Sequence, residues 1–409
     1  MKEVDFPQKR IAIIWTKFLP YHIARIRHLR KRLRSIHWRL TAIEIASKDA
    51  LYPFPEGTTE TDDDYVCLFS GKSYRAIAAS TINATVFRTL EKLQPDVVIA
   101  PSTPFPSGMA SIKYCLNYEK LSVMMDDAWK LSDMRGFLIS MVKKIIHRNI
   151  DVAFIPAPSH AAYYIDKGIP PERIVYGVDV VDNDFFASGA DRARSHADRL
   201  WKELGLPRKF FVFVGRFIQR KGIATLLEAY RRYVHALPND PWGLVLVGEG
   251  DELRVHEKAM LGYPSVKFVG SQFGDQLCTY YGLAGAFVLP SEVETWGLVV
   301  NEAMASGLPV LVSSGCGAGE ALVEEAGNGW TFEPGNADKL SHLMSRISQL
   351  SPAQLRNMGT RSKEIIGHWS LDTFADGVIR ASLFARRDRG SILANLLTKL
   401  WTGRISFYP

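Results

Sequence analysis

Two hydrophobic patterns alternate along the chain. Short apolar runs, typical of buried strands, are separated by segments in which apolar residues recur every three or four positions, as on one face of a helix. The strand candidates of the first half are Ile11–Trp15, Leu40–Ile45, Tyr65–Phe69, Val97–Ala100, Val123–Met125, Val152–Ile155 and Ile174–Tyr176. Those of the second half are Phe211–Val214, Leu244–Val247, Val266–Val269, Ala286–Leu289 and Val310–Val312. This alternation predicts an α/β protein with parallel sheets covered by helices.

The chain of 409 residues is long enough for two such domains. The helical patterns of the first half lie around residues 23–33, 76–93 and 135–148. An aspartate-rich turn and a charged helix occupy the stretch from Val178 to Pro207 and separate the two sets of strands. We therefore expect one Rossmann-like domain over residues 1–185 and a second over residues 186–369.

The segment Ser291–Gly307, SEVETWGLVVNEAMASG, is the strongest candidate for a functional site. It follows the strand candidate Ala286–Leu289, and its apolar positions fit a helix that glycine and proline end. Glu294 then lies in the loop and Glu302 about one turn into the helix. Carboxylates at such a position can accept hydrogen bonds from sugar hydroxyls.

The start of this helix also suits a phosphate. The first N–H groups of a helix have no partner inside it, and the helix dipole favours a negative charge there. The exposed amides would belong to Trp296, Gly297, Leu298 and Val299. Together with the two carboxylates they predict a ligand with both hydroxyls and phosphates, such as a nucleotide sugar. The alternative for the two glutamates is a pair of solvated side chains.

A second motif, GRFIQRKG, follows the strand candidate Phe211–Val214. It places Arg216 and Lys221 at the carboxyl end of a strand, where ligands bind in open α/β sheets. Two cations there can neutralise a diphosphate, and the guanidinium can bind it through two hydrogen bonds. The alternative is a solvated basic turn.

The combined motifs resemble those of the retaining glycosyltransferases of the GT-B fold, in particular family 4, the glycosyl transferases group 1. The stretches that carry the resemblance cover roughly residues 210–374 and are VGRFIQRKG, LVLVGEGDE, VKFVGS, LPSEVETWGLVVNEAMASGLPVLVS and GCGAGEALVEEAGNGWTFEPGN. The resemblance implies two Rossmann-like domains facing across a cleft. It also implies that the C-terminal segment, residues 370–409, returns to the N-terminal domain through a final helix. The N-terminal domain would then bind the acceptor and the C-terminal domain the nucleotide sugar.

The resemblance also implies roles for individual residues. Arg216 and Lys221 would hold the donor diphosphate, Glu294 the hydroxyls of the donor sugar and Glu302 the ribose. The glycine turns at Gly248 and Gly270 would approach the nucleotide, although ordinary strand-to-helix turns account for them equally well. These roles need no cofactor and no metal ion. The Asp62-Asp63-Asp64 run lies in the other half of the chain and is better interpreted as a solvated turn.

The implied reaction is transfer of a sugar from a nucleotide diphosphate with retention of anomeric configuration. The motifs are similar to those of bacterial surface-polysaccharide glycosyltransferases, so we favour a lipid-linked glycan as acceptor. A soluble small-molecule acceptor fits the same motifs. Two different classes of function stay open, a sugar-nucleotide epimerase of the same fold and a binding module without catalysis.

The N-terminal half departs from the family pattern in two places. The loop after its first strand, TKFLPYHIARIR, lacks the glycines common in the family, which leaves His22 as a candidate for acceptor binding. The segment SVMMDDAW has no histidine where the family commonly has one, and Asp126 or Asp127 could take that polar role. The alternative for His22 is an ordinary core or surface histidine. The alternative for Asp126 and Asp127 is a helix N-cap or a solvated turn.

The distribution of charge bears on binding to a membrane surface. The net charge is +7, and seven basic residues with no acidic one lie between Arg25 and Arg39, opposite an apolar stripe. Such a helix favours an anionic membrane surface, and a solvated outer face is the alternative. The tail from Ser391 to Pro409 is also amphipathic, either a second membrane contact or packed on the first domain.

The remaining features bear on location. No motif indicates nucleic acid. No run is long enough to span a bilayer, and the N-terminus lacks the apolar segment of a signal peptide. The four cysteines have no paired spacing, which is typical of a reducing compartment. We expect a cytoplasmic protein, peripheral on the inner face of the cytoplasmic membrane if the basic helix binds lipid.

Overall fold

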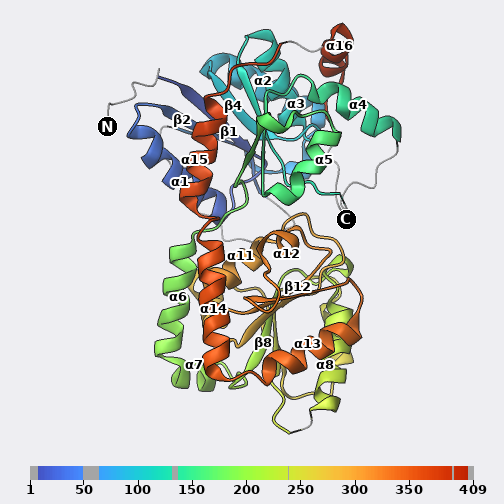
Figure 1. Cartoon of the computed structure of the whole chain (residues 1–409). Coiled ribbons are helices and arrows are strands. Elements are labelled where there is room, and N and C mark those ends of the chain that lie inside the picture. Colours follow the sequence, from blue (N-terminus) through green and yellow to red (C-terminus); the bar gives the residue numbers. More distant parts are fainter. Residues whose placement is uncertain (1–7, 49–63, 131–136, 238, 389–390, 404–409) are drawn as a thin grey trace. The chain divides into compact units, whose positions relative to one another are not determined.

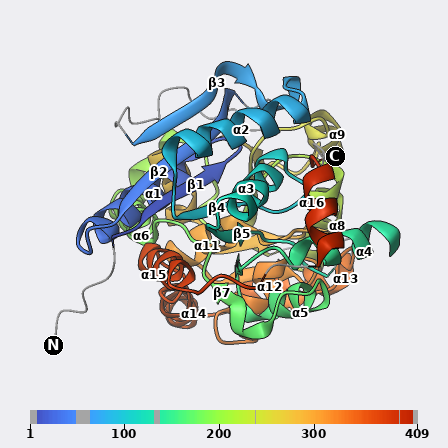
Figure 2. The same cartoon turned by 90° about the horizontal axis from the view of Figure 1, so that it is seen from above.

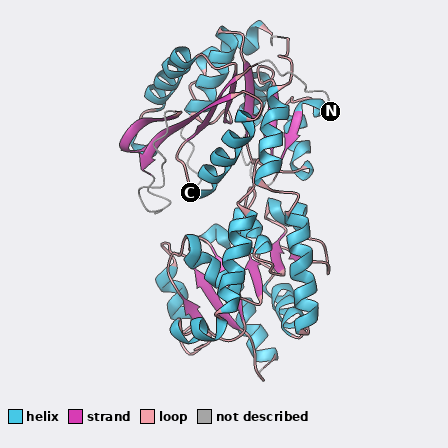
Figure 3. Ribbon diagram, turned by 90° about the vertical axis from the view of Figure 1, so that its left-hand side faces the viewer, coloured by secondary structure: helices cyan, strands magenta, loops and turns pink. Residues whose placement is uncertain are grey.

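The computed structural model describes residues 8–48, 64–130, 137–237, 239–388 and 391–403 (Figure 1). The chain forms two compact units. Unit 1 contains Met1–Val180 and Leu371–Pro409, and unit 2 contains Val181–Ser370. In each unit, helices cover both faces of a sheet (Figure 3). Among the described residues, no helix is long and apolar enough to cross a membrane.

The described part of unit 1 is built on a seven-stranded parallel sheet of order β3-β2-β1-β4-β5-β6-β7. Its strands are β1 (Arg10–Trp15), β2 (Arg39–Lys48), β3 (Tyr65–Ser73), β4 (Val97–Pro101), β5 (Leu121–Met125), β6 (Val152–Ile155) and β7 (Ile174–Tyr176). All seven predicted strands are confirmed. The four residues of β6 are fully buried, as expected for a strand covered on both faces.

Its helices are α1 (Pro20–Arg34), α2 (Ala79–Leu93), α3 (Pro106–Asn117), α4 (Phe137–His147), α5 (Ala161–Asp166), α15 (Leu371–Ser382) and α16 (Ile392–Leu400). Short 3-10 turns occur at Tyr74–Ala76, Pro158–His160 and Pro171–Arg173. Helices α2 and α3 lie on one face of the sheet and α1 and α15 on the other (Figure 2). The sequence pattern did not predict α3, because most of this helix is buried and it lacks the polar face that marks a helix in a sequence.

Helix α15 returns to unit 1, as the resemblance implied. Phe374 is buried, and its ring packs against Phe154 of β6 at a centroid distance of 5.5 Å. On the exposed side, Arg32 of α1 donates to Asp372 and Asp376 of α15, both at 2.6 Å. The buried ring provides most of the binding energy of this helix, since exposed ion pairs contribute at most about 1 kcal/mol each.

The described part of unit 2 has a six-stranded parallel sheet of order β10-β9-β8-β11-β12-β13. Its strands are β8 (Phe210–Val214), β9 (Gly243–Val247), β10 (Val266–Phe268), β11 (Ala286–Leu289), β12 (Val310–Ser313) and β13 (Gly329–Phe332). Five of them were predicted. Strand β13, GWTF, was not, because it is short and its only strongly apolar residues are two aromatic ones.

The helices of unit 2 are α6 (Asn183–Ser195), α7 (Ala197–Glu203), α8 (Ile223–Ala236), α9 (Leu253–Ala259), α10 (Gly274–Leu283), α11 (Leu298–Ala305), α12 (Gly317–Leu322), α13 (Ala337–Ser348) and α14 (Pro352–Ile366). Helices α8 and α13 contact each other, and α6 contacts both α10 and α11. The turn Gln219–Lys221 between β8 and α8 is a 3-10 helix.

Candidate active site

The predicted donor residues lie at the point in the unit 2 sheet where the strand order reverses. From β8 the sheet continues through β9 on one side and through β11 on the other. The loops that leave β8 and β11 therefore flank the point where the strand order reverses, which is where ligands bind in open α/β sheets. Arg216 and Lys221 lie in the first loop, and Glu294 lies in the second.

Backbone contacts hold these two loops side by side. The amide of Glu292 donates to the carbonyl of Arg220 at 2.8 Å. Gly222 has a positive φ of 65°, and a Cβ atom at this position would lie 2.1 Å from the carbonyl oxygen of Pro290. Only glycine permits both the left-handed backbone and this approach.

The ammonium group of Lys221 donates to Oε2 of Glu294 across the two loops. The two side chains are 11% and 16% exposed, so this is a largely buried ion pair. Burial alone would raise the pKa of Glu294, but Lys221, followed by Arg220 and Arg216, more than offsets it and holds this pKa below its ordinary value. Lysine has three N–H donors, so Lys221 can serve Glu294 and a ligand together.

Arg220 is a residue of this site that the sequence analysis missed. Its charge acts on Glu294, and its buried Nε atom has no hydrogen-bond partner in the structure. A buried donor without an acceptor is unfavourable unless a ligand or water supplies one. The available signal was a third cation in RFIQRK, between the two that the family motif singles out.

The loop after β11 is fastened to the start of α12. The amide of Glu294 donates to the carbonyl of Gly315 at 2.9 Å, and the amide of Gly317 donates back to the carbonyl of Glu294 at 3.1 Å. The indole of Trp296 is buried and donates to Asn301 Oδ1 at 2.9 Å. The Trp296 side chain therefore holds the loop together, and any contact it makes with a donor would be through its backbone.

Helix α11 begins as predicted, with Gly297 as its N-cap at a φ of 100°. A Cβ atom on Gly297 would lie 2.8 Å from Sγ of Cys316. Leu298 and Val299 form the first turn, where amides have no acceptor within the helix. The first turn of α11 can therefore receive a phosphate in the way the sequence indicated.

Glu302 lies in α11 and accepts a hydrogen bond from the Tyr281 hydroxyl at 2.8 Å. Burial raises the pKa of Glu302 to about 7, against 4.5 for an exposed glutamate, although the Tyr281 hydrogen bond opposes this shift. The folded state therefore holds this proton more tightly than the unfolded chain does. The resulting stabilisation is fully present below the unfolded pKa and is lost as the pH rises through about 7.

We expect Glu302→Gln to remove this pH dependence. Glutamine keeps an acceptor for Tyr281 but cannot ionise, so the Tm of the variant minus that of the wild type should increase from pH 5 to pH 8. Thermal unfolding without nucleotide, in buffers of equal ionic strength, measures this difference. A difference that stays constant across this range would mean that Glu302 does not titrate there.

Gly248 and Gly270 lie at the ends of β9 and β10, beside the loop after β8. The amide of Gly248 donates to the carbonyl of Gly270 at 2.8 Å. A Cβ atom on Gly248 would lie 1.9 Å from the carbonyl oxygen of Gly215. This close packing explains Gly248 without a ligand, so its predicted approach to the nucleotide stays a prediction.

His22 lies at the start of α1 in unit 1. Its Nδ1 atom is 3.1 Å from the amide of Leu19 and 3.1 Å from the carbonyl of Lys17. Its ring stacks on Trp15 at 4.7 Å. Burial, followed by the nearby charge of Arg25, lowers the pKa of His22 well below its ordinary value. The role of His22 as a neutral ring that caps this helix explains its position without any contact to a sugar acceptor.

Asp126 and Asp127 follow β5 and belong to a partly buried polar cluster of unit 1. Asp126 accepts a hydrogen bond from the Tyr164 hydroxyl at 2.9 Å. Burial and then Asp127 raise the pKa of Asp126 to about 6. Asp179, which follows β7, joins them, and burial followed by Asp127 raises its pKa to about 7. The sequence analysis missed Asp179 because only the sheet order shows that β5 and β7 flank the same strand, β6.

Arg25 shows that the basic face of α1 is not uniform, contrary to the sequence interpretation. Its side chain is buried, 3.6 Å from Asp179, and donates to the carbonyl of Val180 at 2.7 and 2.9 Å. Arg30 is also buried and donates to the carbonyl of Asp64 at 3.0 Å. Arg32 binds the carboxylates of α15. Three of the predicted cations therefore serve the fold of unit 1, and another, Arg39, lies in β2 rather than on α1.

Asp64 is the last residue of the aspartate run and is exposed. Its carbonyl oxygen, rather than its carboxylate, accepts the bond from Arg30. Asp62 and Asp63 lie outside the described residues, so the interpretation of the run as a solvated turn stays a prediction.

Comparison with known proteins gives a family match within unit 2 of the chain. Residues 199–364 match the family described as glycosyl transferases group 1. The sulfoquinovosyl transferase SQD2 of Arabidopsis thaliana is 32% identical over 268 residues, which are 63% of this chain and 50% of that protein. The chain spans about half the length of the curated relatives it matches.

Solved structures extend the likeness to most of the chain. The sucrose-phosphate synthase from Thermosynechococcus elongatus matches with a TM-score of 0.69 and 22% identity, covering 91% of this chain and 98% of that one. Anabaena HepE, solved in complex with UDP-glucose, matches with a TM-score of 0.68 and 18% identity over the same shares. Residues 199–364 are thus similar to the glycosyl transferases group 1, and the chain has the GT-B fold.

Proposed function

We propose that this protein is a retaining glycosyltransferase that moves a sugar from a nucleoside diphosphate to an acceptor hydroxyl without a divalent metal. The observation that supports this most is the buried ion pair between Lys221 and Glu294 at the switch point of the unit 2 sheet. It lies beside the start of α11 and is surrounded by further cations. A site with fixed positive charge and one ionised carboxylate suits a ligand with both phosphates and hydroxyls.

The chemistry follows from these charges. Lys221 and Arg216 would neutralise the diphosphate as it leaves, and the amides of Leu298 and Val299 would bind a phosphate oxygen. Glu294 would accept hydrogen bonds from the sugar hydroxyls, and Glu302 from the ribose. In our proposal the acceptor attacks from the face that the diphosphate leaves, and a phosphate oxygen removes its proton. No protein nucleophile is then needed.

For the acceptor we propose a lipid-linked glycan intermediate of polysaccharide biosynthesis. The carboxylates of Asp126, Asp127 and Asp179 in unit 1 could hold its hydroxyls, since the raised pKa values of Asp126 and Asp179 let these groups both donate and accept near neutral pH. The enzyme would then work in the cytoplasm, at the inner face of the membrane that carries the acceptor.

The test is product formation from a panel of nucleotide sugars, with lipid-linked and soluble glycans as acceptors. We expect release of one nucleoside diphosphate that depends on acceptor, and a product whose anomeric configuration by NMR equals that of the donor. An inverted product would contradict the retaining reaction. Conversion of the donor to an isomer without acceptor would instead indicate an epimerase.

A further inference from the structure

Helix α16 carries apolar side chains on two sides. Ala394, Leu397 and Trp401 face unit 1, where α16 contacts α3 and α4. On the outer side, four large apolar residues are between 52% and 89% exposed: Ile392, Leu393, Leu396 and Leu400. Their spacing places them within about 100° of one another around the helix axis. A surface helix of a globular protein normally exposes a polar face instead.

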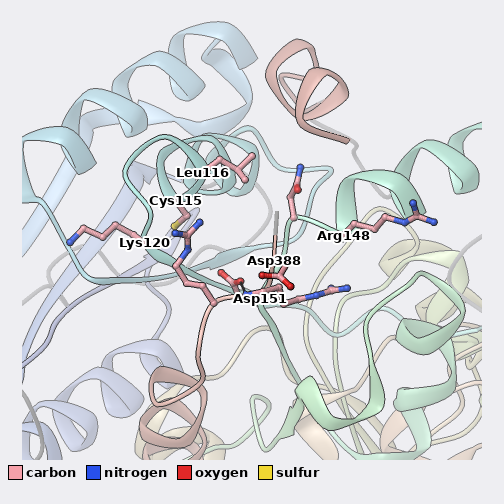
Figure 4. A pocket seen from close by; sticks show the side chains of 9 residues that line it. Cys115, Leu116, Lys120, Arg148, Asp151 and Asp388 are labelled. Atoms are coloured by element: carbon pink, nitrogen blue, oxygen red, sulfur yellow. Dashed lines mark hydrogen bonds between the residues drawn. The ribbon is translucent and has the colours of Figure 1, made fainter. Parts of the chain in front are cut away.

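A small hollow rich in cations adjoins this helix. It lies where β5 and β6 begin and is lined by Lys120, Arg148, Arg386 and Arg387 together with the carboxylates of Asp151 and Asp388 (Figure 4). Asn149, which also lines it, donates to Thr398 Oγ1 of α16 at 3.0 Å. The hollow therefore lies next to α16 in unit 1, at the end of the strands opposite to Asp126.

The cations of the hollow are only partly compensated. Asp151 accepts from the backbone amide of Arg387 at 2.7 Å and from the hydroxyl of Ser122 at 3.0 Å, which occupies both of its oxygens with neutral donors. The buried Nε atom of Arg386 has no hydrogen-bond partner in the structure. Burial and then Arg173 lower the pKa of Arg387; Asp151 and Glu172 oppose this shift, and Arg148 adds to it. These cations therefore crowd one another, which favours an anionic ligand.

We propose that α16 and the adjoining hollow form a docking surface for an anionic lipid bilayer. The four outer residues of α16 would enter the acyl region, and Arg148, Arg386 and Arg387 would bind headgroup phosphates. An apolar helix face flanked by cations is the arrangement expected of an interfacial helix. The inference rests on the proposed function only in that a lipid-linked acceptor places the enzyme at a membrane.

Charge complementarity favours a bilayer over a second copy of this chain. In a two-fold dimer the same patch is present on both sides of the interface, so contact through α16 would bring two cationic hollows together. An anionic bilayer satisfies both the apolar face and the cations. The basic face of α1, in contrast, has three of its cations engaged within unit 1.

Vesicle sedimentation tests the proposal. At low salt, the full chain should pellet with phosphatidylcholine vesicles containing phosphatidylglycerol and be released by salt. A Leu393→Glu and Leu396→Glu double variant should lower the bound fraction about tenfold or more, because it places two charges in the acyl region. Arg148→Glu with Arg386→Glu should weaken binding to anionic vesicles.

The matched controls lie in unit 2. Leu261 is 79% exposed, so Leu261→Glu adds a charge at an equally open apolar site. Arg199 is 64% exposed, so Arg199→Glu reverses a charge far along the chain from the hollow. Both should pellet like the wild type. A triple variant of Arg27, Lys31 and Arg34 to glutamate probes the α1 face and should retain most binding.

Three results would overturn the proposal. The first is a wild-type protein that stays in solution with anionic vesicles. The second is full vesicle binding by the α16 variant together with loss of vesicle binding in the α1 variant. The third is a dimer in light scattering that the α16 variant abolishes, which would assign this face to a second copy. Each variant should keep the thermal shift that the donor nucleotide gives unit 2. Failure of that shift in the wild type would contradict the proposed function and leave the docking test unaffected.

Discussion

Glu294→Ala is expected to lower the rate of sugar transfer by about two to three orders of magnitude, the effect of losing one preorganised contact to the transition state. In the structure the backbone of Glu294 is held by hydrogen bonds of its own amide and carbonyl, and its carboxylate accepts from the ammonium of Lys221. It therefore needs no rearrangement to meet the donor sugar. Steady-state kinetics with saturating donor and acceptor measure the change in kcat.

The variant also leaves Lys221 without its partner. Loss of one member of a buried ion pair destabilises a protein by about 3–5 kcal/mol, so the fraction of folded enzyme must be measured by calorimetry and used to correct the rate. Glu294→Gln keeps an acceptor for Lys221 and should fold better while still losing most activity. Glu292→Ala is the control, because Glu292 is exposed two residues away. Wild-type rates in Glu294→Gln would remove this carboxylate from the reaction.

Gly222→Ala should destabilise unit 2 by about 4 kcal/mol or more, in the exceptional range for a single substitution. The added Cβ atom would lie 2.1 Å from the carbonyl oxygen of Pro290, and both groups belong to the loops that hold Lys221 and Glu294 together. Relief of this contact requires the loops to separate. We therefore expect loss of nucleotide binding along with the lower stability.

Gly335→Ala isolates the effect of backbone conformation. Gly335 has a φ of 76°, close to the 65° of Gly222, but a Cβ atom there would meet nothing within 4 Å. Its substitution should destabilise by only about 1–2 kcal/mol, the energy of a left-handed alanine. Calorimetric transitions of the two variants measure the difference. Equal effects would show that the contact with Pro290 is not tight.

Much of the fold was predictable because buried parallel strands leave a strong signal. Most predicted strands were short apolar runs, and the structure moves most of their ends by only a residue or two. The signal fails where a helix is buried on nearly every side, as in α3, or where a strand has few apolar residues, as in β13. Both depend on their neighbours for stability rather than on a pattern of their own.

The donor site followed the same rule. Residues in the loop that follows a strand, such as Arg216 and Glu294, could be placed at the carboxyl ends of the strands from the sequence alone. What could not be predicted is pairing between loops: the Glu292 amide on the Arg220 carbonyl, the Lys221–Glu294 ion pair, and the grouping of Asp179 with Asp126. These depend on strand order, which hydrophobic periodicity does not determine.

The basic helix α1 shows a different limit. Its sequence predicts a row of cations on one solvent-facing side, but Arg25 and Arg30 are long enough to turn inward and satisfy backbone carbonyls. Periodicity gives the direction of a Cβ atom and not the end of a long side chain. The membrane-docking surface was therefore easier to recognise on α16, where the exposed side chains are apolar.

The central claim is that the loops after β8 and β11 bind a nucleoside diphosphate, and thermal shift tests it most directly. Wild type, Arg216→Ala, Lys221→Ala and the control Arg199→Ala would be heated with UDP, GDP, ADP, TDP and CMP. A ligand at about 100 times its Kd adds about 2.7 kcal/mol of stability. We predict a higher Tm with one diphosphate in the wild type and the control, and no shift in the two site variants. An equal shift in Lys221→Ala, or none with any nucleotide in the wild type, would contradict the account.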